Sequence, residues 1–285
     1  MKKRIYVFSV FFVISILMNF TVYAGGQPKN IMLLFDLKDY NKEIDYTIDS
    51  FFKKCLGSND QLIIMTPTNK LYSYSSKILS ESRKKINKEV KDTIKKHTSI
   101  SGADYRNIYT QMLSLVNEIR GDIGSQDVKN LIAAYENNRR ELRMTRRINE
   151  DLLLKFSDVF KRSQEVTGDT ENHIYLFFQK EYRPIPDKDT MNNLRDNQQI
   201  AFKVMEVFMQ EKSKTDFASE KIGEELREAK VIFNFIYINP KELSTQRYQL
   251  IDNSGDFYNA MTKIVEITGG KKVTTTKPKI IFEDI

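Results

Sequence analysis

The stretch KNIMLLFDLKDYNKEIDYTIDSFFKK, residues 29–54, decides the fold that we expect for this chain. Its apolar run at 31–35 is typical of a strand covered on both faces of a sheet, and the run ends on an acid, Asp36. Apolar residues then recur at steps of three and four over 44–55, which predicts an amphipathic helix. A strand that ends on an acid and leads into a helix is typical of an open α/β sheet, in which ligands bind at the carboxyl ends of the strands.

The same alternation of strands and helices continues along the chain. Apolar runs at 172–184 and 231–239 predict two more buried strands, and KKVTTT near the end predicts a final edge strand. Residues 61–66 and 69–75 lie on either side of a short turn and predict an antiparallel hairpin at the edge of the sheet. We therefore expect a doubly wound, mostly parallel six-stranded sheet flanked by helices.

Two charged segments, 76–100 and 125–165, interrupt this pattern, and we interpret both as helical insertions into a single domain that covers 25–285. The sequence SISGAD is expected to break the first charged helix. One long helix is expected from 128 to 161, and five arginines fall on it between 139 and 147. Such a run indicates a solvated face, with an acidic partner or lipid head groups as the alternative.

The first 24 residues have the pattern of a secretory signal peptide. Lys2, Lys3 and Arg4 precede an apolar run at 5–20, and small residues at 22 and 24 suit cleavage by a signal peptidase. We expect an exported protein, periplasmic or secreted, that meets the membrane only transiently through this segment. The alternative is an uncleaved N-terminal anchor, for which the apolar run is short.

The net charge and the cysteine content limit which partners the chain is expected to bind and whether a disulfide can stabilise it. Removal of residues 1–24, which carry three basic residues and no acid, lowers the formal net charge from +7 to +4. We read this excess as spread along the chain, and it does not predict a nucleic-acid partner, which needs a clustered basic footprint. Cys55 is the only cysteine, so no disulfide can form within the chain.

Several segments, in this order, resemble von Willebrand factor A-like domains, in particular the divergent exported bacterial group. They are LLFD followed by a helix and DQLIIMT, then SGADYRNIYTQMLSLVNEI, and finally YNAMTKIVEITGG. The resemblance covers about residues 29–276, interrupted by the charged helices. It implies a doubly wound sheet whose ligands bind at the carboxyl ends of the strands.

The resemblance also implies where a metal ion would bind. Family members that hold a divalent cation use a D-x-S-x-S loop, a Thr from a second loop and an Asp from another, because Mg²⁺ prefers six oxygen ligands. Here the first loop reads DLKDY, so Asp36 is kept but Lys38 and Tyr40 replace the two serines. The second loop has Ala103 near the Thr position, next to Asp104. We therefore expect no metal and no cofactor, and we expect the Lys38 ammonium to pair with Asp36.

Residues Lys180, Glu181, Tyr182 and Arg183 are the candidate contacts with a partner. They follow an expected strand and should lie on a loop at its carboxyl end, beside Asp36. Tyr and Arg are favoured at interaction hot spots. The alternative is an ordinary strand end whose tyrosine packs on the sheet.

The motifs of catalysis are missing from the sequence. His97 and His173 are the only histidines, no G-x-S-x-G is present, and no glycine-rich loop opens a helix. We therefore expect a binding or scaffold module and not an enzyme, with another protein as its partner. One alternative is an exported hydrolase with a pocket that contains His97 or His173 and an acid. The other is a structural protein that self-associates through the long charged helix.

Overall fold

The computed structural model describes residues 28–119, 125–167, 170–193, 202, 204, 206–208, 217–239 and 248–276. The expected signal peptide at 1–24 lies outside these residues. The apolar residues within 190–212 also predict a helix, and most of that segment lies outside the described residues as well. Within the described part of the chain, no helix is both long and apolar enough to span a membrane.

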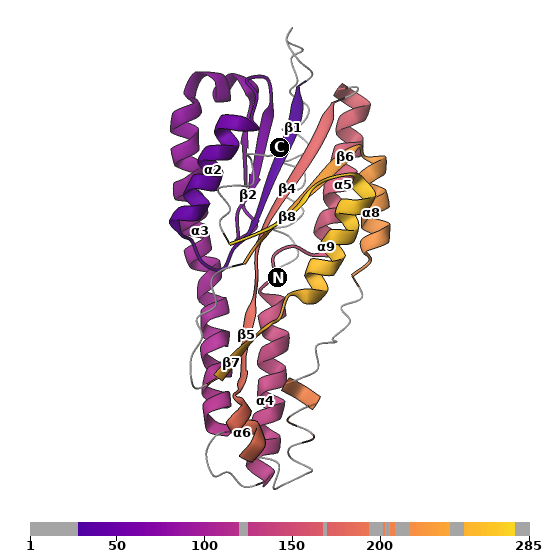
Figure 1. Cartoon of the computed structure of the whole chain (residues 1–285). Helices are drawn as coiled ribbons and strands as arrows, with labels where there is room; N and C mark the ends of the chain where they lie inside the picture. Colours follow the sequence, from indigo (N-terminus) through magenta and orange to yellow (C-terminus); the bar gives the residue numbers. More distant parts are fainter. Residues whose placement is uncertain are drawn as a thin grey trace, which may run out of the picture.

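Six strands form the central sheet in the order β3-β2-β1-β4-β6-β8 (Figure 1). Their bounds are Lys29–Asp36 for β1, Gln61–Met65 for β2, Leu71–Tyr74 for β3, Glu171–Gln179 for β4, Val231–Ile238 for β6 and Lys272–Thr275 for β8. All neighbouring strands are parallel except β2 and β3, which form an antiparallel hairpin. The mostly parallel sheet and its edge hairpin confirm the predicted fold class.

Helices cover both faces of this sheet (Figure 1). One face is covered by α2 (Lys42–Lys54) and the first half of α3 (Ser76–Ile119), and the other by α5 (Glu150–Thr167), α8 (Ser219–Glu228) and α9 (Gly255–Thr268). Alternate side chains of the buried strands fill the two cores between the layers. This layered arrangement is consistent with a von Willebrand factor A-like fold.

The direction of the strand order reverses between β1 and β4, whose carboxyl ends lie side by side. Asp36 at the end of β1 is in register with Phe178 of β4. Such a reversal is where open α/β sheets place their ligands. The fold therefore brings the acid singled out in the sequence to the expected position.

Helix α3 spans 44 residues with a kink at Ser82, where the backbone is non-helical, and it is unbroken from 83 to 119. The break expected at SISGAD is therefore wrong, because Ser101 and Gly102 are buried inside the helix against neighbouring structure. Residues 76–100, which the sequence suggested as an insertion, pack on the sheet through Ile86, Val90 and Ile94.

A second part of the molecule projects beyond the carboxyl ends of the strands, and we call it the extension (Figure 1). It contains residues 101–119 of α3, helix α4 (Ser125–Met144), the short helix α6 (Lys188–Asn193), and a two-stranded antiparallel sheet of β5 (Tyr182–Pro186) and β7 (Tyr248–Asp252). It has its own apolar core, which includes Met112, Val116, Tyr135, Ile185 and Phe208.

Two expected elements are each divided where the extension joins the sheet. The strand expected at 172–184 ends at Gln179, and Tyr182 begins β5 in the separate sheet. The single helix expected at 128–161 is two helices, because Asn149 accepts a hydrogen bond from the Leu152 backbone N–H at 2.9 Å and so begins α5 anew. Strand β7 was not predicted.

Candidate functional site

The candidate site lies at the carboxyl ends of β1 and β4. The loop after β1 is held there by Gln179, whose Oε1 accepts hydrogen bonds from the backbone N–H groups of Lys38 at 2.9 Å and Asp39 at 2.8 Å. Both donors belong to the DLKDY loop, so the last side chain of β4 fixes the position of Lys38.

The Lys38 ammonium lies between two carboxylates. Its Nζ is 2.8 Å from Oδ1 of Asp36 and 3.4 Å from Oε1 of Glu181. Both acids are 0% exposed and Lys38 is 4% exposed, so all three charges are removed from water. A buried charge is stable only when it is paired. The pairing of Lys38 with Asp36 that the sequence predicted is present.

The second oxygen of Asp36 is also occupied. Its Oδ2 accepts a hydrogen bond from the Arg147 backbone N–H at 2.9 Å, while Lys38 Nζ lies 3.5 Å from the Thr145 carbonyl oxygen. Thr145 and Arg147 belong to the link between α4 and α5. The extension therefore closes over the carboxylate that the resemblance would assign to a metal ion.

These residues do not fit a divalent cation. An ion bound to Asp36 would have to displace the Lys38 ammonium, and the two serine oxygens of the family loop are replaced by Lys38 and Tyr40. Over the described ranges, no group of three or more acidic, histidine or cysteine side chains is placed to hold a metal. Mg²⁺ requires six oxygen ligands in octahedral geometry.

Arg146 continues the chain of charges toward α9. Its Nε is 2.9 Å from Oε2 of Glu181, one terminal nitrogen is 3.2 Å from Oδ2 of Asp256, and the other donates to the Asn253 carbonyl at 2.6 Å. Burial lowers the pKa of Arg146, but the nearby carboxylates of Glu181 and Asp256 outweigh burial and raise the pKa above its ordinary value. The guanidinium is thus held in its charged form.

Asp36, Lys38, Glu181, Arg146 and Asp256 together form one connected set, which we call the buried charge network. It joins the end of β1, the link between β4 and β5, the link between α4 and α5, and the start of α9. Because its ion pairs connect these four parts of the chain, the network acts as a joint between the sheet and the extension.

Gly102 allows α3 to pass close to the DLKDY loop. A Cβ atom at this position would lie 2.1 Å from the Lys38 carbonyl oxygen, to which Arg106 also donates at 3.3 Å. A contact that short is not possible, so only glycine fits. The glycine that suggested a helix break is needed for close packing instead.

The other residues expected at the site lie around its edge. Asp104 is exposed and pairs with Arg147 at 3.3 Å. Tyr40 is half-buried, and its hydroxyl donates to Asp45 at 2.6 Å. Within the described residues, neither of these side chains forms a hydrogen bond or ion pair with Asp36 or Lys38, so neither completes a site around the buried acid.

The loop at 180–183 differs from the expectation. Lys180 is partly exposed and pairs with Asp252 at 3.5 Å, but Glu181, Tyr182 and Arg183 are all buried. Their expected place on an exposed loop is wrong, because the chain passes directly into β5 and is covered by the extension. These three side chains cannot serve as exposed contacts for a partner.

Arg183 lies deepest of this group, with 1% of its surface exposed. It donates to the Tyr135 hydroxyl at 3.3 Å and to the Phe208 carbonyl at 3.1 Å. Tyr135 in turn donates to the Pro184 carbonyl at 2.6 Å. The side chain therefore holds α4, β5 and residues 206–208 together inside the extension.

The two histidines lie in different places, His97 beside Thr68 in the loop after β2 and His173 near the start of β4. His97 Nδ1 is 2.6 Å from the Thr68 hydroxyl and Nε2 is 3.3 Å from the Tyr72 hydroxyl. His173 lies near the start of β4, with Nε2 3.2 Å from Glu171. Neither described environment places a histidine between a nucleophile and a carboxylate, the arrangement that hydrolases use.

Sequence reasoning missed Arg146 and Asp256, and it placed the arginines of 139–147 on a solvated face. Arg146 is only 8% exposed, so that expectation is wrong for this residue. A usable signal was present: Asn149, Glu150 and Asp151 form a helix start, which predicts a break just after the arginines.

Comparison with protein-family models and with curated proteins finds no match. Among solved structures, the chain is similar to an aerotolerance-related membrane protein from Bacteroides fragilis NCTC 9343 that carries multiple mutations to serine. The identity is 8%, the match covers 90% of this chain and 96% of that chain, and the TM-score is 0.35. A likeness of this size carries no argument about the site.

Proposed function

We propose that the chain is an exported protein-binding module that uses no metal ion and no catalysis, and whose extension takes over the contact with a partner. The observation that carries this proposal is the Lys38 ammonium, 2.8 Å from Asp36, in the position where a related domain would hold a cation. A filled and covered site cannot recruit a partner carboxylate through a metal.

The place of contact follows from the same geometry. In the related fold, ligands bind at the carboxyl ends of the strands. Here the extension covers those ends, so its outer surface is what an approaching protein meets (Figure 1). The signal-like pattern of 1–24 supports export, although these residues lie outside the described structure.

Metal independence can be tested without a known partner. MgCl₂ and MnCl₂ are titrated into the protein after treatment with EDTA, and the unfolding temperature is recorded. We expect no saturable rise. A rise in the unfolding temperature that saturates below about 1 mM, and that disappears in Asp36→Asn, would contradict the proposal because a functional cation site would then exist.

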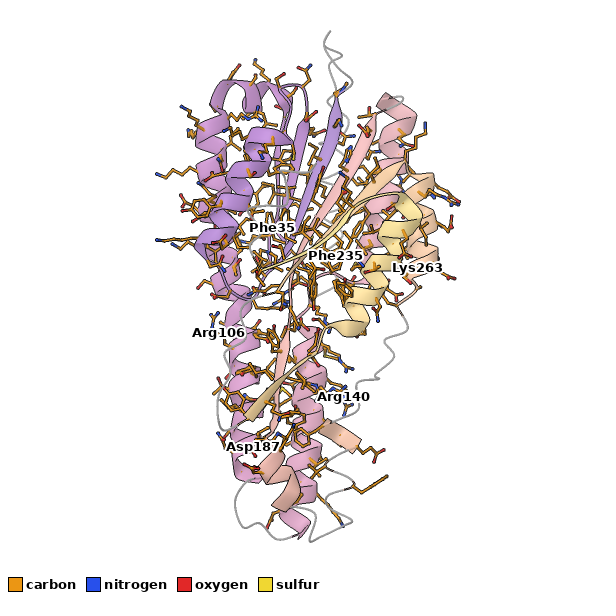
Figure 2. All side chains as sticks on the ribbon, viewed as in Figure 1. Phe35, Arg106, Arg140, Asp187, Phe235 and Lys263 are labelled. Atoms are coloured by element: carbon orange, nitrogen blue, oxygen red, sulfur yellow. The ribbon has the colours of Figure 1, made fainter. Side chains whose placement is uncertain are left out.

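The contact surface can be tested with a photo-reactive amino acid at two exposed positions. Arg140 lies on the extension and Lys263 lies on α9, far from it (Figure 2). Cross-linking in the exporting cell should yield an adduct with a second protein from position 140 and none from position 263. An adduct with the mass of two chains would favour self-association instead.

A further inference from the structure

The positive charge of the chain is not spread evenly, contrary to our reading of the sequence. Residues 76–100 contain eight Lys and Arg against three Asp and Glu, a net charge of +5. The formal charge of residues 25–285 is +4, so everything in that range outside 76–100 sums to −1. The whole positive excess lies on the first half of α3.

The inward-facing basic residues of this segment are engaged in the fold. Arg83 donates to the carbonyls of Phe52 and Leu56 at the end of α2. Lys91 pairs with Asp49 of α2 at 2.8 Å. These contacts attach α3 to α2 and leave the outward face of α3 to the remaining lysines.

Five outward lysines form a basic face on α3. Lys84, Lys88 and Lys95 are separated by four and seven residues, a spacing that places them on one side of a helix. Lys85 and Lys96 flank this row, and all five side chains are exposed. None of the five forms an ion pair with a residue that the structure describes.

Exposed acids are fewer than exposed lysines along this face. The stretch holds three exposed acids, Glu81, Glu89 and Asp92, against the five exposed lysines of the face. Of these acids, Glu89 accepts a hydrogen bond from the Tyr74 hydroxyl at 3.2 Å. Exposed apolar side chains stand at both ends of the segment: Ile78 is 48% exposed and Ile100 is 53% exposed. A helix face with lysines between two isoleucines has the composition of an interfacial helix.

We propose that the outward face of α3, from Ile78 to Ile100, binds the surface of an anionic lipid bilayer. Five lysines and no arginine suit a diffuse field of phosphate charges, because an ammonium acts as a flexible point charge and not as a bidentate fork. The helix lies along the outside of the sheet layer, where a flat surface can reach it (Figure 1). The exposed isoleucines can enter the head-group region. This inference does not depend on the proposed protein contact at the extension.

The test is co-sedimentation of the full chain with vesicles of phosphatidylcholine alone or mixed with phosphatidylglycerol. Phosphatidylcholine vesicles measure any binding through the apolar N-terminal residues, which all variants share. We expect much stronger binding to the anionic vesicles, and we expect it to be lost at about 1 M salt, where the Debye length is about 3 Å.

The decisive variant is Lys84→Glu/Lys88→Glu/Lys95→Glu. Each lysine near an anionic surface contributes about fivefold, so the partition coefficient should fall by at least about 100-fold. The matched control is Lys155→Glu/Lys221→Glu/Lys263→Glu, which makes the same charge change on exposed residues of α5, α8 and α9. The partition coefficient of the control should fall by less than about tenfold. Urea unfolding should show that both variants are folded.

A second variant separates the membrane from a soluble polyanion. Ile78→Ser/Ile100→Ser should weaken binding to anionic vesicles several-fold and leave retention on heparin unchanged. The inference is overturned if the wild type binds both kinds of vesicle equally. It is also overturned if the partition coefficient falls equally in the α3 lysine variant and in the control variant. A third outcome overturns it as well: the protein binds heparin more tightly than the vesicles, and the isoleucine variant binds heparin and vesicles as the wild type does. That outcome would indicate that the partner is an acidic macromolecule.

Discussion

Nε of Arg146 lies 2.9 Å from Oε2 of Glu181, and this contact joins the link between α4 and α5 to the end of β4. The two residues come from parts of the chain that flank α5 and β4. Their pairing holds the extension against the sheet, and it takes the place of the open ligand site expected at this edge.

Arg146→Met should destabilise the protein by about 3–5 kcal/mol, because Glu181 would keep a fully buried charge without this partner and the partly buried Asp256 would lose its partner as well. The free energy of unfolding in urea measures the effect. Arg140→Met removes an exposed arginine from the preceding helix, α4, and should change stability by less than about 0.5 kcal/mol. Equal losses in both variants would show that the network does not stabilise the joint.

Lys38→Met should cost about 3–5 kcal/mol for the same reason, since Asp36 and Glu181 lose a shared cation. Adding Asp36→Asn to it should cost less than the sum of the two single losses, by about 0.5–3 kcal/mol, because the partner charge is removed as well. A double-mutant cycle at neutral pH measures this coupling. Strict additivity would contradict the observed pairing.

Gly102→Ala should destabilise the protein, although alanine in a helix is ordinarily about 1 kcal/mol better than glycine. The added methyl group would meet the Lys38 carbonyl oxygen at 2.1 Å and push α3 from the loop. The matched control is Gly255→Ala, where nothing lies within 4 Å of the new atom, and it should be neutral or stabilising. Thermal unfolding of both variants decides the question.

The stability of the fold should fall as the pH drops through the range of histidine titration. Burial, followed by the nearby charges of Lys70 and Lys96, lowers the pKa of His97 below its ordinary value of 6.5. The unfolded chain then takes up a proton before the folded chain does, so this contribution is fully present above pH 6.5 and is lost as the pH falls further. His97→Gln should flatten the loss of stability between neutral and mildly acidic pH; an unchanged slope would contradict the role of His97.

The sheet was predictable because its signals are local. The apolar runs in β1, β4 and β6 are each continuous or nearly so. Runs of this kind predict buried strands without any knowledge of tertiary contacts. The pairing of Lys38 with Asp36 was also predictable, because two positions in sequence separate them. Strand β7, with side chains only partly buried, has no comparable pattern.

The joint was not predictable because its members are distant in sequence. Arg146 lies 35 positions from Glu181 and 110 from Asp256, and only the folded chain brings them together. The helix break expected at SISGAD was wrong because a local preference was overridden. Glycine has a low helix propensity, but at Gly102 the helix packs closely against the Lys38 carbonyl and continues. Local sequence patterns determine the helices and strands, whereas the burial of charged side chains depends on tertiary contacts.

After the kink at Ser82, helix α3 runs without interruption from the lysine face into the core of the extension, and its 37 residues from 83 to 119 span about 56 Å. It therefore serves as a strut that crosses the boundary between the two parts. A force applied to the far tip of the extension is therefore transmitted to the sheet along one rigid helix. When the molecule is pulled at that tip, we expect the extension to carry the tension and not to bend at a hinge.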